Sequence, residues 1–185
     1  MNKKKAPRGT LSLPTIASLR AKTPRSRYFS DVDVLDSAGA ALSLDALSLY
    51  ELSPFAQALS AADGVMVAHI SYPKIDDEHI ASQSEVFITG ILRGSFHFDG
   101  IVMSDDFRMA GLRKQTSLKD AAVQFIRAGG DLILCGANHS YQKQILEGLY
   151  EAVERGALTE ERLNESVYRI LSAKIRVTGW DPFEN

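Results

Sequence analysis

Polar side chains follow three apolar runs of the sequence, at points where strands of a sheet would end. In parallel α/β folds the functional groups gather just beyond the carboxyl ends of the strands, because loops and helix N-termini converge there. The three positions are His69 at the end of residues 64–69, Asp105 and Asp106 after residues 98–104, and residues 136–138 after residues 131–135. A carboxylate that directly follows a buried strand is held rigidly, as a nucleophile requires. Asp105 is therefore the first candidate for catalysis.

Helix capping is the structural alternative for Asp105 and Asp106. An aspartate at a strand-to-helix junction accepts hydrogen bonds from backbone N–H groups whether or not it takes part in chemistry. Position alone leaves both interpretations open for either aspartate. Gly129 and Gly130 are simpler, because they precede a predicted strand and not a helix. They therefore predict a turn and not a phosphate-binding loop.

The elements that must position these residues alternate between helix and strand. Short continuous apolar runs predict strands buried on both faces, and apolar residues at helical spacing predict amphipathic helices. The predicted strands are residues 64–69, 98–104 and 131–135, and the predicted helices are residues 44–59, 84–93 (with Val86, Ile88, Ile91 and Leu92 as the apolar face), 117–128, 141–155 and 160–176. This order favours right-handed βαβ units and a parallel sheet, which is the α/β class. Three strands cannot make a closed eight-stranded barrel, which takes ~250 residues.

The composition is that of one soluble globular domain. Hydrophobic residues make up 45% and charged residues 24% of the 185 residues, which is enough to bury a core. The net charge of −2 lacks a basic excess, so we expect neither nucleic acid nor a membrane surface as a partner. Cys135, the single cysteine, lies in an apolar run and should be a buried small hydrophobe. No long apolar stretch follows the basic N-terminus, so we expect no signal peptide and take the cytoplasm as the default location.

Four segments in order resemble the signatures of family 3 glycoside hydrolases. Residues 98–109 are similar to the family's G-F-D-G approach to an S/T-D-x-x-x-M motif, in which the aspartate is the nucleophile, and this resemblance places that role on Asp105. Residues 51–55 resemble its E-L-x-P-F helix, residues 66–69 its M-x-A-H strand end, and residues 128–134 its A-G-x-D-x-x-L strand. The resemblance implies a partial TIM barrel: residues 1–43 as an irregular lead-in with the remnant of a catalytic loop, and residues 44–185 as the C-terminal half of a (β/α)8 barrel with about three parallel strands and flanking helices.

Within the family the chain is most similar to bacterial β-N-acetylhexosaminidases. That resemblance implies removal of terminal β-linked N-acetylglucosamine from peptidoglycan fragments, with retention of configuration through a covalent intermediate. The acid/base of this subgroup is the His of a D-S-H loop. Here Asp36 lies in the nearest match, and Ala38 stands where the His should be. The upstream K-H-F-P-G-H-G-like segment has no good match either, so Asp36 marks at most a degenerate dyad.

The remaining candidates are weaker. His69 at a strand end and Met109 after the aspartates are predicted to contact substrate, with a pocket wall and the core as the respective structural alternatives. The other histidines, His79, His97 and His139, fall in predicted loops. No His, Cys, Asp or Glu grouping has metal-ligand spacing, so we expect no metal and no cofactor.

Three functions remain open at this stage. The first is hydrolysis of O-glycosidic bonds of a small carbohydrate, with Asp105 as nucleophile. The second is a catalytically inactive truncated or split-gene remnant that only binds sugar or needs a partner chain, since an open half barrel exposes strand edges and invites self-association. The third is an unrelated phosphate-binding half barrel. It is disfavoured because no Lys lies at a predicted strand end and no Gly-rich loop meets a helix.

Overall fold

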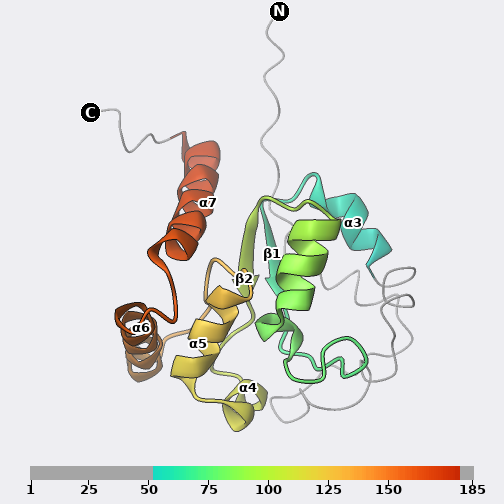
Figure 1. Cartoon of the computed structure of the whole chain (residues 1–185). Coiled ribbons are helices and arrows are strands. Elements are labelled where there is room, and N and C mark those ends of the chain that lie inside the picture. Colours follow the sequence, from blue (N-terminus) through green and yellow to red (C-terminus); the bar gives the residue numbers. More distant parts are fainter. Residues whose placement is uncertain (1–51, 180–185) are drawn as a thin grey trace, which may run out of the picture.

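The computed structural model describes residues 52–179 (Figure 1). The elements in chain order are α3 (Ser53–Leu59), β1 (Gly64–Val67), η2 (Ala81–Gln83), η3 (Val86–Ser95), β2 (Ile101–Ser104), α4 (Ala110–Gln115), α5 (Leu118–Arg127), α6 (His139–Glu154) and α7 (Glu160–Thr178). In this part of the chain β1 and β2 form a two-stranded parallel sheet, paired from Gly64 with Ile101 to Val67 with Ser104. In Figure 1, α6 and α7 lie to one side of the strands and α3 lies to the other. The predicted α/β class and parallel pairing are confirmed.

The third predicted strand, residues 131–135, is reduced to one parallel bridge between Met103 and Leu132. The segment does run beside β2, because the N–H of Ser104 donates to the carbonyl of Leu132 at 3.0 Å. The next rung is lost because the N–H of Leu134 donates to the hydroxyl of Ser104 at 3.0 Å and not to a backbone carbonyl. The prediction of a full third strand is therefore wrong in the described residues. Cys135, on this segment, is half-buried and not fully buried as predicted.

Local signals placed most helix ends correctly. The hydroxyl of Ser117 accepts from the N–H of Asp120 at 3.1 Å at the start of α5, and Thr159 caps α7 in the same way. At the start of α6, Asn138 accepts from the N–H of Tyr141. His139 is consequently the first residue of a helix, so its assignment to a loop is wrong. None of the helices within residues 52–179 is long and apolar enough to span a membrane.

The helix predicted over residues 84–93 is the π-helix η3, and its buried face differs from the predicted one. Its bonds run from i to i+5, as between the N–H of Phe96 and the carbonyl of Ile91. Phe87, Ile88 and Ile91 are buried, whereas Val86 is 43% exposed. The wider turn moves the buried face away from the positions that a 3.6-residue period selects, so the prediction for Val86 is wrong.

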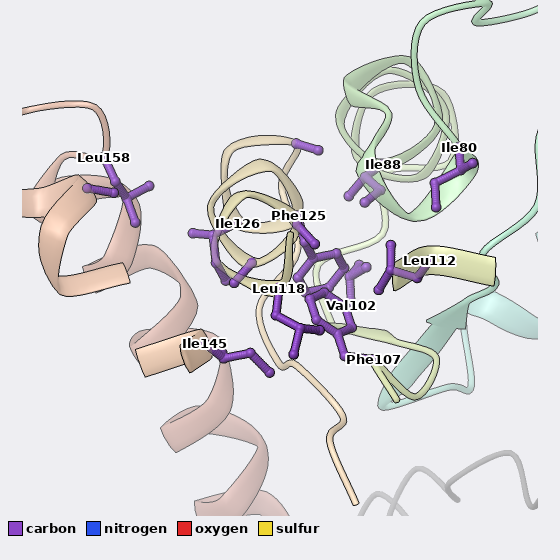
Figure 2. Packing of buried hydrophobic residues seen from close by; sticks show 14 of the residues in the cluster. Ile80, Ile88, Val102, Phe107, Leu112, Leu118, Phe125, Ile126, Ile145 and Leu158 are labelled. Carbon is purple, nitrogen blue, oxygen red and sulfur yellow. The ribbon is translucent and has the colours of Figure 1, made fainter. Parts of the chain in front are cut away.

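The hydrophobic core lies between β2, α5 and η3. Figure 2 shows Phe125 of α5 beside Phe107, which follows β2, and both side chains are fully buried. Their rings meet edge to face with centroids 6.2 Å apart. Leu112 enters the same cluster from α4, a helix that the sequence did not predict. This core fixes the loop that leaves the carboxyl end of β2.

The opposite end of the sheet is held by the carboxylate of Asp131, whose side chain is 0% exposed. Its Oδ2 accepts from the N–H of Val102 at 2.9 Å and from the guanidinium of Arg93. Its Oδ1 accepts from the hydroxyl of Ser166 at 2.9 Å and from Arg169 at 3.0 Å. One buried carboxylate therefore ties β2 to η3 and to α7.

A glycine in α6 sets how closely that helix approaches α5. A Cβ at Gly148 would lie 2.6 Å from Cα of Lys119. We expect Gly148→Ala to lower the free energy of unfolding by about 1–3 kcal/mol, because the α5 backbone must shift, although Ala is the better helix former. Gly90→Ala in η3 is the matched control, since its Cβ meets nothing closer than 3.8 Å and the change should be neutral or stabilising. Urea titrations measure both variants, and an equal effect at the two positions would contradict this explanation.

Candidate active site

Asp105 lies directly after β2, at the carboxyl end of the sheet. Its N–H donates to the carbonyl of Val67 at 3.0 Å, which anchors its backbone to the end of β1. Two residues on, the N–H of Phe107 donates to the carbonyl of Leu134 at 2.9 Å. The loop is thus fixed to a neighbouring segment on each side. Asp105 is half-buried, and its Oδ1 accepts from the N–H of Asp106 at 2.8 Å.

The carboxylate of Asp106 has several partners within its own loop region. Its Oδ1 accepts from the N–H of Arg108 at 2.9 Å and from the N–H of Gly136 at 3.4 Å, and its Oδ2 accepts from Nε of Arg108 at 2.8 Å. Burial acts to raise the pKa of Asp106, but these hydrogen bonds outweigh it and hold the pKa below its usual value. Asp106 therefore fixes the turn and the neighbouring loop, whereas the Asp105 carboxylate accepts one hydrogen bond within the described residues, from the N–H of Asp106.

Neither aspartate caps helix α4, although Asp106 does accept backbone N–H groups, as the structural alternative predicted. The N-cap position of α4 is Met109, and no side chain accepts a capping hydrogen bond there. Met109 is half-buried, and its N–H donates to the carbonyl of Asp106 at 3.0 Å. Phe107, between the aspartates and Met109, belongs to the core. The turn thus runs from Asp106 to Met109 and begins one residue after Asp105. The predicted contact of Met109 with substrate stays a prediction.

His69 lies beneath the same loop and is 1% exposed. Its Nδ1 is 2.7 Å from the hydroxyl of Ser82, and its ring meets that of Phe107 edge to face at 5.5 Å. Burial lowers the pKa of His69, while smaller opposing effects come from the Asp105 carboxylate and from the backbone of Asp106 and Asp105. The imidazole is therefore neutral at pH 7. The predicted contact of His69 with substrate also stays a prediction.

Of the other predicted positions, two lie within the described residues and two lie outside them. Asp36 and Ala38 lie outside the described residues. His97 is exposed, and His79 is partly buried beside Asp76. Within residues 52–179 no three His, Cys, Asp or Glu side chains are grouped so as to hold a metal ion. At the carboxyl end of β2 the described residues thus bring together the carboxylates of Asp105 and Asp106 and the buried imidazole of His69.

Comparison with known proteins identifies the family. Residues 35–173 match the glycosyl hydrolase family 3 N terminal domain, which is well over half of the chain. The chain belongs to glycosyl hydrolase family 3. A beta-hexosaminidase of Stenotrophomonas maltophilia is 34% identical over 161 residues, covering 82% of this chain and 48% of the relative. A beta-hexosaminidase of Idiomarina loihiensis is 33% identical over 111 residues, covering 60% of this chain and 33% of the relative.

Solved structures of the family agree with the fold. A family 3 beta-N-acetylglucosaminidase from Paenibacillus sp. has a TM-score of 0.72 and 35% identity, with 78% of this chain and 28% of that chain covered. The beta-N-acetylglucosaminidase from Thermotoga maritima has a TM-score of 0.68 and 28% identity, with 75% and 30% covered. The chain thus spans between a third and a half of the two curated relatives. It is a partial α/β domain of a family 3 protein.

Two hydrogen-bond partners of the candidate site residues were not predicted from the sequence. Ser82 holds His69 from a position 13 residues away, and Arg108 holds Asp106. The first pair carries no local pattern, because the connecting loop decides whether the two side chains meet. The second had a signal, since an arginine two residues after an aspartate at a turn can close back on it. The resemblance implied roles for Asp105, His69 and Met109, but it carried no information on the residues that hold their side chains in place.

Proposed function

We propose that this chain is the C-terminal half of a family 3 TIM barrel and that it serves the hydrolysis of O-glycosidic bonds with Asp105 as nucleophile. The observation that carries the proposal is the contrast between the two aspartates. Asp106 is committed to Arg108, whereas the Asp105 carboxylate accepts one N–H from its neighbour and sits at the carboxyl end of the sheet, where barrel enzymes place their chemistry. A fixed carboxylate there can attack a sugar carbon.

The substrate that we propose is a terminal β-linked N-acetylglucosamine, as in fragments of peptidoglycan. The beta-hexosaminidase and beta-N-acetylglucosaminidase names of the relatives support that sugar. An oxygen of Asp105 would attack the anomeric carbon while the bond to the leaving oxygen breaks, which forms a glycosyl ester. Water then attacks the same carbon, gives up one proton to the solvent, releases the carboxylate and yields the sugar with its original β configuration.

Proton supply decides which substrates this chain can use. The leaving oxygen of a natural glycoside needs a proton, and the D-S-A segment offers alanine, Ala38, in place of an acid/base histidine. A nitrophenolate leaves near neutral pH without that proton. We therefore expect the chain to act on p-nitrophenyl N-acetyl-β-glucosaminide and to leave alkyl and disaccharide glycosides almost untouched.

The experiment is hydrolysis of that nitrophenyl glycoside by the purified full chain, with the configuration of the first-formed sugar followed by NMR. The expected result is slow release of nitrophenolate with the β anomer formed first. A first-formed α anomer would contradict a nucleophilic role for Asp105. Equal rates on nitrophenyl and methyl glycosides would contradict the absence of a proton donor.

A second candidate function rests on the exposure of β1. All four residues of this strand are only partly buried, although Gly64–Val67 is the apolar run of a strand that parallel sheets cover on both faces. A second copy or an N-terminal half-barrel chain that adds strands here would cover it. In this alternative the chain alone binds sugar without turnover. Two measurements distinguish this alternative: sedimentation of the chain, and activity with and without an added N-terminal half of a family 3 relative. A chain that is monomeric and active alone would exclude the alternative.

A further inference from the structure

One ring nitrogen of His69 lacks a hydrogen-bond partner. Nδ1 of this ring contacts the Ser82 hydroxyl at 2.7 Å, whereas Nε2 is buried and has no hydrogen-bond partner in the described structure. Ser82 is itself 0% exposed. A buried polar atom without a partner costs free energy, so its retention in a tightly packed place calls for a reason.

Two contacts place the ring under the aspartate loop. Val67, two residues before His69, accepts the N–H of Asp105. Phe107, two residues after Asp105, packs its ring edge to face on the imidazole. The backbone of Asp105 and of Asp106 acts to raise the pKa of His69, so it lies close to the ring. Since Nδ1 faces Ser82, we take Nε2 to be the nitrogen on the side of that backbone.

We propose that His69 is a positioning residue for Asp105. In this role the Ser82 hydroxyl donates to Nδ1, which fixes the neutral tautomer with its proton on Nε2. The Nε2–H is then aimed at the backbone carbonyls of the Asp105–Asp106 loop and bonds one of them when the nucleophile engages a sugar. This role deepens the proposed function and rests on it. In place of the predicted contact with substrate, His69 would act on Asp105 through the loop.

The tautomer can be tested without any catalytic activity. Long-range ¹H–¹⁵N NMR of the full chain should show His69 neutral at pH 7 with the proton on Nε2, and Ser82→Ala should give a mixture of tautomers. A dominant Nδ1–H form in the unmodified chain would overturn the proposal. This readout keeps its meaning even if the chain hydrolyses nothing.

The positioning effect is tested with two matched substitutions. The amide of Gln can replace Nε2 of histidine and that of Asn can replace Nδ1, so His69→Gln keeps the bond toward the loop and His69→Asn keeps the bond to Ser82. The amide of Asp106 donates to Oδ1 of Asp105. The rate of hydrogen exchange at this amide therefore reports how firmly the Asp105 carboxylate is held in position. We expect that exchange to be roughly five- to tenfold faster in His69→Asn and unchanged in His69→Gln, as the loss of one hydrogen bond implies.

Kinetics on the nitrophenyl glycoside complete the test. His69→Asn should lower kcat and leave KM unchanged, whereas His69→Gln should keep kcat close to that of the unmodified chain. A merely structural role predicts equal losses in both variants, which would overturn the proposal. If Asp105→Asn leaves hydrolysis intact, the proposed function has failed, while the tautomer and exchange results still decide whether His69 orders the loop.

Discussion

Replacing Asp131 with asparagine is expected to lower the free energy of unfolding by about 3–5 kcal/mol, a large part of the ~5–15 kcal/mol that holds a typical domain together. The carboxylate is fully buried and lies among the guanidinium groups of Arg93, Arg162 and Arg169. Asparagine has nearly the same shape but leaves these charges without their anion. Burial already lowers the pKa of Arg93 and of Arg162, because water reaches their charged groups poorly. Without the Asp131 anion these charges have neither water nor a counter-ion, which destabilises the folded state. Urea titration followed by circular dichroism measures the loss.

Glu165→Gln is the control for Asp131→Asn. Glu165 also pairs with Arg162 and Arg169, at 3.7 Å and 3.6 Å, but its side chain is 57% exposed. Solvent screens such pairs, so the change should cost less than about 1 kcal/mol and should vanish at high salt. The effect of Asp131→Asn should persist at high salt. Similar losses in the two variants would show that burial is not the source of the Asp131 effect.

The parts of the fold that the sequence predicted are those decided by near neighbours. Ser117 and Thr159 cap their helices through N–H groups three residues away, and an N-cap residue before a periodic segment predicts that bond. The strand before Asp105 was visible as an apolar run. The short helix α4 was not, because its six residues bury only Gly111 and Leu112 and show no periodic face.

The parts that the sequence did not predict are decided by distant partners. Asp131 reaches Val102, Ser166 and Arg169 across 29, 35 and 38 residues, and a single aspartate in an apolar run gives no indication of which residues it will meet. The polar face of α7 was a usable signal, since Arg162, Ser166 and Arg169 recur at helical spacing where an apolar face would be expected. The pairing of His69 with Ser82 was not predicted for the same reason, because the two residues are 13 apart in the sequence.

Replacing Asp105 with asparagine is expected to abolish turnover of the nitrophenyl glycoside, by about three orders of magnitude or more in kcat, the scale of loss when a covalent nucleophile is removed. Asparagine keeps an oxygen for the N–H of Asp106, so the loop is retained while the attacking charge is lost.

Azide added to Asp105→Ala can enter the vacated space and attack the anomeric carbon as the nitrophenolate leaves. The product would be the α-glycosyl azide, because a single displacement inverts the carbon.

Asp106→Asn separates the nucleophile from its neighbour. The pair of Asp106 with Arg108 is partly exposed, and breaking it removes about 1 kcal/mol or less of loop stability. Turnover should therefore fall by roughly tenfold at most, and azide should give no glycosyl azide. The opposite ranking, with Asp106→Asn inactive and Asp105→Asn near normal, would move the nucleophile by one residue. Asp106 would then have to leave Arg108 before it could attack, at the further cost of breaking the bonds that now hold it.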